Sequence, residues 1–242
     1  MSKVKSKEEY VFLARMAEQS ERYDEMVEYS TEFTKKANGE LSLDERNILS
    51  VAFKNAVGSR RASWRVLTSI EQKEEKKENG QVEKVKKYKQ DIEAEIKKYC
   101  EKILSLIDNS LLKSASSDEA KVFFNKMKAD YYRYLAEFQK GEAKNTSSNK
   151  ALDAYQVAYE IAENKLTSTD PIRLGLCLNF SVFYYEIMQQ PDKAIDMAKK
   201  SFDDAIANLD NVTDESYKDA TLIMQLLRDN LTLWNSDMPE EQ

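Results

Sequence analysis

The sequence contains no histidine and only two cysteines. Without histidine, the chain lacks the usual general base near neutral pH, the commonest metal ligand and every Ser-His-Asp arrangement. Its two cysteines, Cys100 and Cys177, form no CxxC pair, so we expect reduced, buried thiols. Glycine-rich phosphate loops, GxSxG motifs and zinc-ligand spacings are also missing. The sequence therefore predicts no catalytic residue, no metal site and no cofactor, and the protein is not expected to be an enzyme.

Glycine and proline are scarce, with 5 and 3 residues in a chain of 242. Tight turns depend on these residues, so a fold built from many hairpins is disfavoured. The first residues, MSKVKSKEEY, lack the apolar stretch of a signal peptide, and no run of about 18 apolar residues is long enough to cross a membrane. A net charge of −6 disfavours bulk nucleic-acid binding. We expect a cytoplasmic protein, with a nuclear pool also compatible, that binds no nucleic acid and does not insert into membranes.

Apolar residues recur at three- and four-residue spacing along nearly the whole chain, which is typical of amphipathic helices. Ser42 and Glu45 have the spacing of a capping box at the start of a long helix, and Pro171 and Pro191 suit the first turns of two later helices. The polar stretch 141–149 is interpreted as a linker. Helices are expected at about 6–20, 23–37, 42–75, 81–112, 117–139 and 214–235. Three further helices are expected between the last two of these: one that ends near 166, one that begins at 171 and one that begins at 191.

This pattern predicts an all-α protein of about nine helices, in which sequential neighbours pack antiparallel because their connections are short. We expect residues 1–235 to form a single helical domain and residues 236–242 to form a short, acidic, disordered tail. Ala198 and Phe202 resemble half of a tetratricopeptide unit, but no repeat of about 34 residues follows. The spacing therefore supports only a tetratricopeptide-like stack of helices.

Basic residues on two of the predicted helices suggest an anion site. Lys54 and Arg61 are seven residues apart on the third helix, which places them about 10 Å apart on one face. Arg133 and Tyr134 lie in a tyrosine-rich run on the fifth helix, with Lys126 two turns earlier. If both helices face a common groove, Lys54, Arg61, Arg133 and the Tyr134 hydroxyl could converge and bind a phosphate dianion. From spacing alone, solvated surface charge remains the simpler interpretation.

Two later helices each carry an asparagine within an apolar stripe. A buried amide needs hydrogen-bond partners, whereas an amide that faces an extended ligand could bind the main chain of that ligand. The pattern alone favours ordinary core packing. The first stripe comprises Leu178, Asn179, Val182 and Glu186, and the second comprises Leu222, Leu226, Asn230, Leu233 and Trp234.

Several long sequence blocks resemble the 14-3-3 family, and the resemblance extends over about residues 8–238. The first block is RNILSVAFKN at 46–55, and the others lie at 126–137, 171–176, 179–186 and 217–234. The family implies a nine-helix, W-shaped dimer with one amphipathic groove per protomer. It also implies a phosphoserine- or phosphothreonine-dependent adaptor that regulates the activity, location or assembly of client proteins. A phosphorylation-independent helical scaffold is the alternative.

The resemblance also assigns roles to individual residues by position. The phosphate would be bound by Lys54, Arg61, Arg133 and Tyr134. Asn179 and Asn230 would hold the ligand main chain on either side of the phosphorylated residue. The apolar wall would comprise Leu178, Val182, Leu222, Ile223, Leu226 and Leu233. The outer polar contacts would come from Lys126, Glu186 and Trp234. The implied ligands are extended segments similar to Arg-Ser-x-pSer-x-Pro.

A homodimer, or a heterodimer with family members, is implied by the same resemblance. Family members commonly pair an acid near Glu25 with a base near Asp91, whereas this chain has acids at both positions. An exposed ion pair contributes only about 0–1 kcal/mol, so we expect the dimer to persist through apolar burial, with Arg22 and Glu95 still paired. The matching interface positions are Met16, Ser20, Arg22, Leu67, Ile70, Tyr88 and Glu95.

Ser63 follows two arginines and resembles a site for a basic-directed kinase. Its position matches the dimer interface of the family. A phosphate there would add about −1.5 to −2 charges to a packed surface, which is expected to loosen the dimer. A chance match explains the motif equally well.

Overall fold

The structure is a computed structural model that describes residues 5–77 and 80–237. Within these two ranges all regular structure is helical and no strand is present. The same residues form nine long helices, because the π-helical turn Ile107–Leu111 and the short α5, Leu112–Ser114, directly continue α4. The all-α prediction is therefore confirmed.

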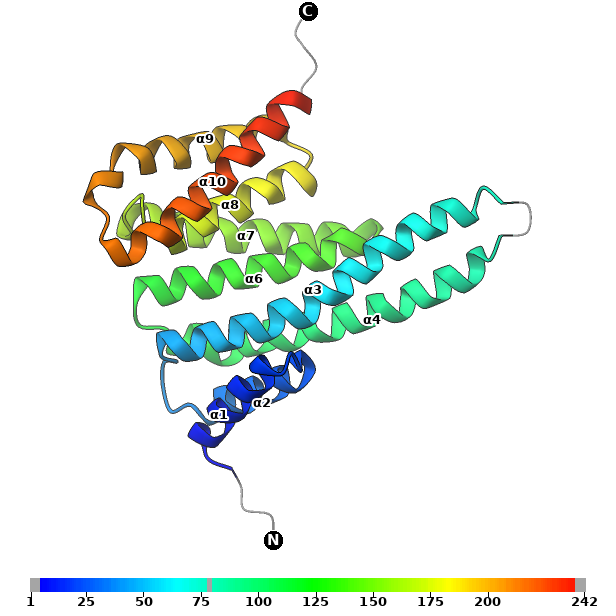
Figure 1. Cartoon of the computed structure of the whole chain (residues 1–242), viewed down its shortest axis with the longest axis horizontal. Coiled ribbons are helices and arrows are strands. Elements are labelled where there is room, and N and C mark those ends of the chain that lie inside the picture. Colours follow the sequence, from blue (N-terminus) through cyan, green and yellow to red (C-terminus); the bar gives the residue numbers. More distant parts are fainter. Residues whose placement is uncertain (1–4, 78–79, 238–242) are drawn as a thin grey trace, which may run out of the picture. The chain divides into compact units, whose positions relative to one another are not determined.

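The first of two compact units, Met1–Ala115, contains the N-terminal helices. These helices are α1 (Lys7–Gln19), α2 (Tyr23–Lys36), α3 (Leu43–Glu74) and α4 (Val82–Leu106). Sequential helices pack against each other, and α3 and α4 form a long antiparallel pair (Figure 1). Large apolar side chains such as Phe33, Phe53 and Ile103 are fully buried in this unit. Its helices are thus amphipathic, as their spacing predicts.

The second unit, Ser116–Gln242, contains two cores that share one helix. Its helices are α6 (Asp118–Phe138), α7 (Gly141–Lys165), α8 (Pro171–Glu186), α9 (Pro191–Ala207), the 3-10 turn η2 (Leu209–Asn211) and α10 (Asp214–Asp237). Tyr155, Phe180 and Phe183 belong to the core formed by α6, α7 and α8. Leu174 and Leu227 belong to the core formed by α8, α9 and α10. Because α8 contributes to both cores, it is apolar on more than one side.

The expected capping box is present at the start of α3. The Ser42 hydroxyl accepts a hydrogen bond from the Glu45 backbone N–H at 3.2 Å, and the Ser42 N–H donates to the Glu45 carboxylate at 3.0 Å. These two bonds satisfy backbone donors that a helix start otherwise leaves unpaired. They fix the beginning of the helix that carries Lys54 and Arg61.

Replacing Ser42 with alanine is expected to lower the free energy of unfolding by about 1 kcal/mol, because one capping bond is lost. Denaturant unfolding followed by circular dichroism would measure the change. Ser69→Ala is the matched control, since Ser69 is exposed within α3, and it should change stability by less than about 0.5 kcal/mol. Equal effects of the two substitutions would contradict a capping role.

The prediction of a polar linker at 141–149 is wrong. Helix α7 begins at Gly141, which adopts a φ of 57° that favours glycine. Ser147 and Ser148 are buried, and the Ser147 hydroxyl donates to the Gln139 side-chain oxygen at 2.6 Å. Small polar residues let α6 and α7 pack closely here without an apolar stripe. The sequence 141–149 has the composition of a loop but forms the first two turns of α7.

The C-terminal boundary also differs from the prediction. Helix α10 continues to Asp237, so Ser236 and Asp237 are helical and do not belong to a tail. Residues 238–242 of the expected tail lie outside the described part of the chain. The single domain expected over 1–235 stays a prediction. Among the described residues, no helix is both long and apolar enough to cross a membrane.

Candidate functional site

A buried polar cluster surrounds Asp130 on α6. Asp130 and Arg133 are each only 6% exposed. The Asp130 carboxylate accepts a hydrogen bond from Lys126 Nζ at 2.9 Å and one from Arg133 Nη2 at 3.4 Å. These partners lie four residues before and three residues after Asp130, so all three side chains share one helix face. The spacing thus places one carboxylate between two cations.

Side chains from two other helices complete this cluster. Tyr155 of α7 donates its hydroxyl hydrogen to Asp130 and accepts a hydrogen bond from Arg133 Nε at 3.1 Å. Asn179 of α8 donates from its amide nitrogen to both Asp130 carboxylate oxygens, at 3.0 Å each. The second unit therefore brings together three predicted site residues, Lys126, Arg133 and Asn179. We call Lys126, Asp130, Arg133, Tyr155 and Asn179 the Asp130 cluster.

Sequence reasoning missed two members of the Asp130 cluster. For Asp130 a signal was available, because an acid with Lys126 at i−4 and Arg133 at i+3 is placed to bind both. For Tyr155 the sequence gives no such signal. Its ring is fully buried and stacks on Phe180 with centroids 4.8 Å apart, like an ordinary core residue.

The charges of the Asp130 cluster stabilise one another despite their burial. Burial alone would raise the pKa of Asp130, but the nearby Lys126 and Arg133 charges outweigh it and lower that pKa from its usual value. Burial would likewise lower the pKa of Arg133, yet Tyr155, Tyr134 and Asp130 hold that pKa well above its usual value. The pKa of Tyr155 is raised well above 10.0, mainly by burial. Near neutral pH the aspartate and arginine are thus charged, and the tyrosine is neutral.

The cluster orients the guanidinium group of Arg133. Its Nε and Nη2 atoms form one edge, and this edge is bound by Tyr155 and Asp130. The Nη1 atom forms an ion pair with the Glu137 carboxylate at 3.7 Å, which is longer than a hydrogen bond. The guanidinium carbon lies 4.8 Å from the centre of the Tyr134 ring. Glu137 is the most distant of these polar partners, so the Nη1 end is the part of Arg133 most suited to exchange its partner for an external anion.

Lys54 and Arg61 belong to the first unit and lie on α3. The Lys54 side chain is exposed and Arg61 is partly exposed. Their seven-residue spacing on one continuous helix agrees with the sequence prediction. The two units are described separately, so the convergence of Lys54 and Arg61 with Arg133 and Tyr134 stays a prediction.

Helix α10 presents exposed leucines. Leu222, Leu226 and Leu233 are 62%, 44% and 55% exposed. These fractions are large for leucine side chains, and three of them on one helix form an apolar surface that we call the leucine face. Asn230 is partly buried on the same helix. The leucine face is thus accessible to a ligand, and its role as an apolar wall stays a prediction.

The remaining wall positions lie deeper in the second unit. Leu178, Val182 and Ile223 are partly buried against the core of α8, α9 and α10, and Glu186 is exposed. Trp234 was expected among the outer polar contacts, but it is only 4% exposed. Its ring stacks on Tyr185 with centroids 4.8 Å apart. Trp234 therefore packs in this core and helps to fix α10 against α8.

The predicted dimer positions differ in their exposure. Met16, Ile70 and Tyr88 are exposed, whereas Leu67 is buried within its own chain. Arg22 forms an ion pair with Glu25 three residues later. Glu95 instead accepts a hydrogen bond from Arg60, which also binds Asp24 at 3.0 and 3.1 Å. Arg22 and Glu95 thus both have partners within the chain.

Ser63, the possible phosphorylation site, lies on α3 beside these positions. Its side chain is exposed, and its hydroxyl donates to the backbone carbonyl of Ser59 at 3.1 Å. The hydroxyl is therefore reachable from solvent, as modification by a kinase requires.

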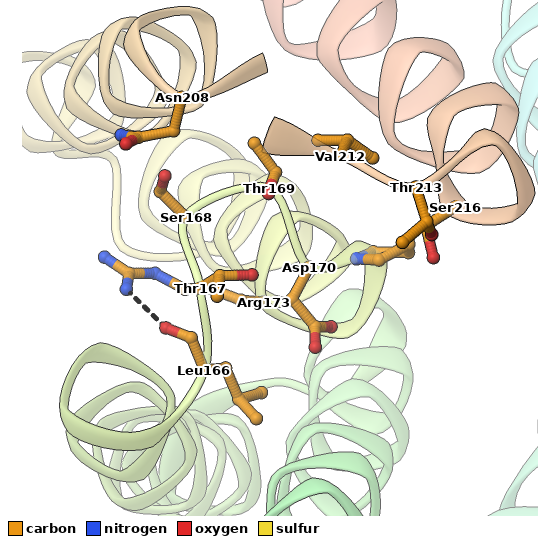
Figure 2. A pocket seen from close by; sticks show the side chains of 11 residues that line it. Leu166, Thr167, Ser168, Thr169, Asp170, Arg173, Asn208, Val212, Thr213 and Ser216 are labelled. Carbon is orange, nitrogen blue, oxygen red and sulfur yellow. Dashed lines mark hydrogen bonds between the residues drawn. The ribbon is translucent and has the colours of Figure 1, made fainter. Parts of the chain in front are cut away.

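A hollow of about 630 Å³ lies between the α7–α8 connection and the start of α10 (Figure 2). Serine and threonine residues and Asn208 line much of it. The guanidinium of Arg173 donates to the Leu166 carbonyl at 2.9 Å and lies 3.8 Å from Glu163. Because this cation already has acceptors, we assign no ligand to the hollow. Metal sites are also not indicated, since no suitable group of three His, Cys, Asp or Glu residues occurs in the described ranges.

Comparison with known proteins identifies the family of this chain. The family model described as 14-3-3 protein matches residues 13–235. This chain belongs to the 14-3-3 family. It is 58% identical to 14-3-3 protein 3 of Entamoeba histolytica, over 98% of this chain and 99% of that protein. It is 54% identical to 14-3-3-like protein C of Glycine max, over 100% of this chain and 93% of that protein.

A fungal relative is equally similar, since a 14-3-3 protein homolog of Trichoderma harzianum is 57% identical over 96% of this chain and 89% of that protein. This 14-3-3 chain is therefore a phosphoserine-binding adaptor of a family that is not enzymatic. The adaptor prediction is confirmed at the level of the family. The residues that carry the binding remain to be tested.

Proposed function

We propose that this 14-3-3 protein binds a client phosphate through Lys54, Arg61, Arg133 and Tyr134. The Asp130 cluster is the observation that supports this most directly. It holds a buried, permanently charged guanidinium in one orientation, and its Nη1 end is suited to an external acceptor. An arginine held in this way loses little side-chain entropy when it binds phosphate. The sequence block at 46–55 links Lys54 to the same function by family resemblance.

We further propose that the client segment lies extended between the asparagines and the leucine face. Asn179 and Asn230 would bind its main chain, and Leu178, Val182 and Ile223 would contact its side chains together with the leucine face. Lys126 and Glu186 would bind polar groups at the outer edge. An apolar wall accepts varied flanking residues, whereas the charged phosphate fixes the register. Segments similar to Arg-Ser-x-pSer-x-Pro fit this arrangement.

A titration with a labelled Arg-Ser-x-Ser-x-Pro peptide, phosphorylated and unphosphorylated in parallel, tests this proposal. Fluorescence anisotropy should show micromolar or tighter binding of the phosphorylated form alone. Arg61→Ala and Lys54→Ala should each weaken that binding, because each removes a charge-assisted contact worth about 1.5–3 kcal/mol. Equal binding of both peptides would favour the phosphorylation-independent scaffold.

Binding of the phosphorylated peptide is expected to weaken in mild acid because the phosphate gains a proton, and not because the protein changes its charge. The second pKa of a phosphoserine is about 6, so the dianion becomes a monoanion between about pH 7 and pH 5. The pKa of Asp130 is lowered from its usual value by Lys126 and Arg133, so this carboxylate stays ionised over the same range. Anisotropy at a series of pH values should show affinity falling several-fold with a midpoint near pH 6. A non-titrating phosphonate monoanion, used as the control ligand, should bind equally throughout.

We also propose that the protein is a dimer, as a homodimer or with other family members, and that it acts in the cytoplasm and the nucleus. The exposed Met16, Ile70 and Tyr88 of the first unit supply apolar surface for such an interface. Association would require Arg22 and Glu95 to exchange their partners within the chain for each other. Sedimentation at micromolar concentration should show a dimer, and a monomer alone would contradict the proposal.

Ser63 offers a way to regulate this interface. We propose that a kinase which recognises basic residues modifies it, because the exposed hydroxyl follows Arg60 and Arg61. The added charge would repel the neighbouring protomer. The phosphomimetic Ser63→Asp should therefore dissociate at a higher protein concentration than Ser63→Ala. A fully dimeric Ser63→Asp protein would count against this role.

A further inference from the structure

Asp130 contacts more proposed binding residues than any other side chain named above. It accepts hydrogen bonds from Lys126, Arg133, Tyr155 and Asn179, which come from three helices. Its two carboxylate oxygens are already bound by these donors of the chain itself. Its carboxylate would also repel a phosphate. A role in arranging its neighbours therefore fits Asp130 better than direct binding.

The contact with Asp130 determines which end of the Asn179 amide faces the carboxylate. An ionised carboxylate accepts hydrogen bonds and donates none. The amide group of Asn179 must therefore turn its nitrogen toward Asp130, where it lies 3.0 Å from both carboxylate oxygens. The amide oxygen then points away from Asp130, and an oxygen can only accept.

We propose that Asp130 is a positioning residue that makes Asn179 an acceptor for a main-chain N–H of the client segment. The inference rests on the proposed function, because it concerns a residue of the same site. Through Tyr155 and Nη2, Asp130 also holds the edge of Arg133 so that Nη1 is directed to the phosphate. One buried carboxylate thus sets the orientation of the group that binds the phosphate and the group that binds the main chain.

Tyr155 and Asp130 are expected to act on different parts of the ligand. The Tyr155 hydroxyl bridges Asp130 and Arg133 but has no recorded bond to Asn179. Its loss should therefore loosen Arg133 and leave Asn179 in place. Loss of the Asp130 charge should instead free the Asn179 amide to turn over, because an amide at position 130 can donate as well as accept.

Ester-containing phosphopeptides distinguish these effects. In each of two peptides, one main-chain N–H beside the phosphoserine is replaced by an ester oxygen, on the N-terminal side in one peptide and on the C-terminal side in the other. In the unmodified protein, one of the two esters should weaken binding about fivefold to tenfold, which corresponds to one hydrogen bond. Asn179→Ala should abolish that loss and so show which N–H is involved.

In the Asp130→Asn variant the same ester should weaken peptide binding by less than about twofold, because the freed Asn179 amide can turn to suit either the amide peptide or the ester peptide. The ratio compares two ligands on one variant, so a general change in stability or charge cancels. Tyr155→Phe, which keeps the aromatic ring, should bind the phosphopeptide at least about fivefold more weakly. The ester should weaken binding to this variant by the same factor as in the unmodified protein. Tyr155→Phe keeps the proposal testable if Asp130→Asn does not fold.

An ester loss that is the same in Asp130→Asn and the unmodified protein would overturn the positioning role. So would the absence of any ester loss in the unmodified protein, or a Tyr155→Phe variant with full phosphopeptide affinity. The proposed function fails in a different way. In that case the unmodified protein would not distinguish the phosphorylated peptide from the unphosphorylated one, before any variant is made.

Discussion

Replacing Arg133 with alanine is expected to weaken binding of a phosphoserine peptide by at least about a hundredfold. The guanidinium would supply at least two charge-assisted hydrogen bonds of about 1.5–3 kcal/mol each, and every 1.4 kcal/mol corresponds to a factor of about ten. Arg133→Lys should be intermediate, because lysine keeps the charge but not the fork. Fluorescence anisotropy with the phosphorylated peptide measures the three affinities.

Arg15→Ala is the matched control for this substitution. Arg15 is an exposed arginine of α1 that bonds to Asp44, so its removal should leave the affinity unchanged within about twofold. Circular dichroism of each variant would show whether the fold is kept, since Arg133 is itself part of the buried cluster. A folded Arg133→Ala protein with nearly full affinity would remove Arg133 from the phosphate site.

Phe180→Ala is expected to lower the free energy of unfolding by about 3–5 kcal/mol, more than any other substitution proposed for this protein. Phe180 is 2% exposed and lies among aromatic rings, with centroids 4.8 Å from Tyr155 and 4.7 Å from Tyr184. Alanine would leave a cavity between α7 and α8 that these rigid rings cannot fill. Denaturant unfolding followed by circular dichroism would measure the free energy change.

The control for this substitution is Tyr217→Ala, which removes an exposed ring from α10. It should change the free energy of unfolding by no more than about 0.5 kcal/mol. Phe180→Leu should fall between the two, because leucine fills part of the space. Similar losses for Phe180→Ala and Tyr217→Ala would mean that the aromatic cluster contributes little to stability.

The sequence predicts the helices well where their ends carry chemical signals. Ser42 with Glu45, Pro171 and Pro191 each begin a helix as expected, because a cap or a proline acts locally. Residues 141–149 carry no such signal, since serine and asparagine favour turns and caps over helix interiors. There the helix is stabilised by contact with α6, which depends on residues distant in the sequence.

Burial is harder to predict than helix formation, because it too depends on contacts between residues that are distant in the sequence. Leu67 was expected at an interface and Trp234 at the ligand, yet both are buried in their own units. A helix has several faces, and periodicity shows which residues share one without showing what covers it. Tyr155 illustrates the same limit, because its role depends on Asp130 and Arg133 of another helix. These assignments require the packing of the helices to be known.

The buried carboxylate of Asp130 has a consequence for how long a client remains bound. If Arg133 binds phosphate as proposed, the phosphate shares that guanidinium with a fixed negative charge. The repulsion shortens the lifetime of the complex more than it slows its formation, since changes within an interface act mainly on the dissociation rate. A phosphate held in the proposed site would become accessible to a phosphatase when the segment is released. In the proposed site, Asp130 would thus both orient the binding groups and limit how long they hold the phosphate, which would keep the association with a client reversible.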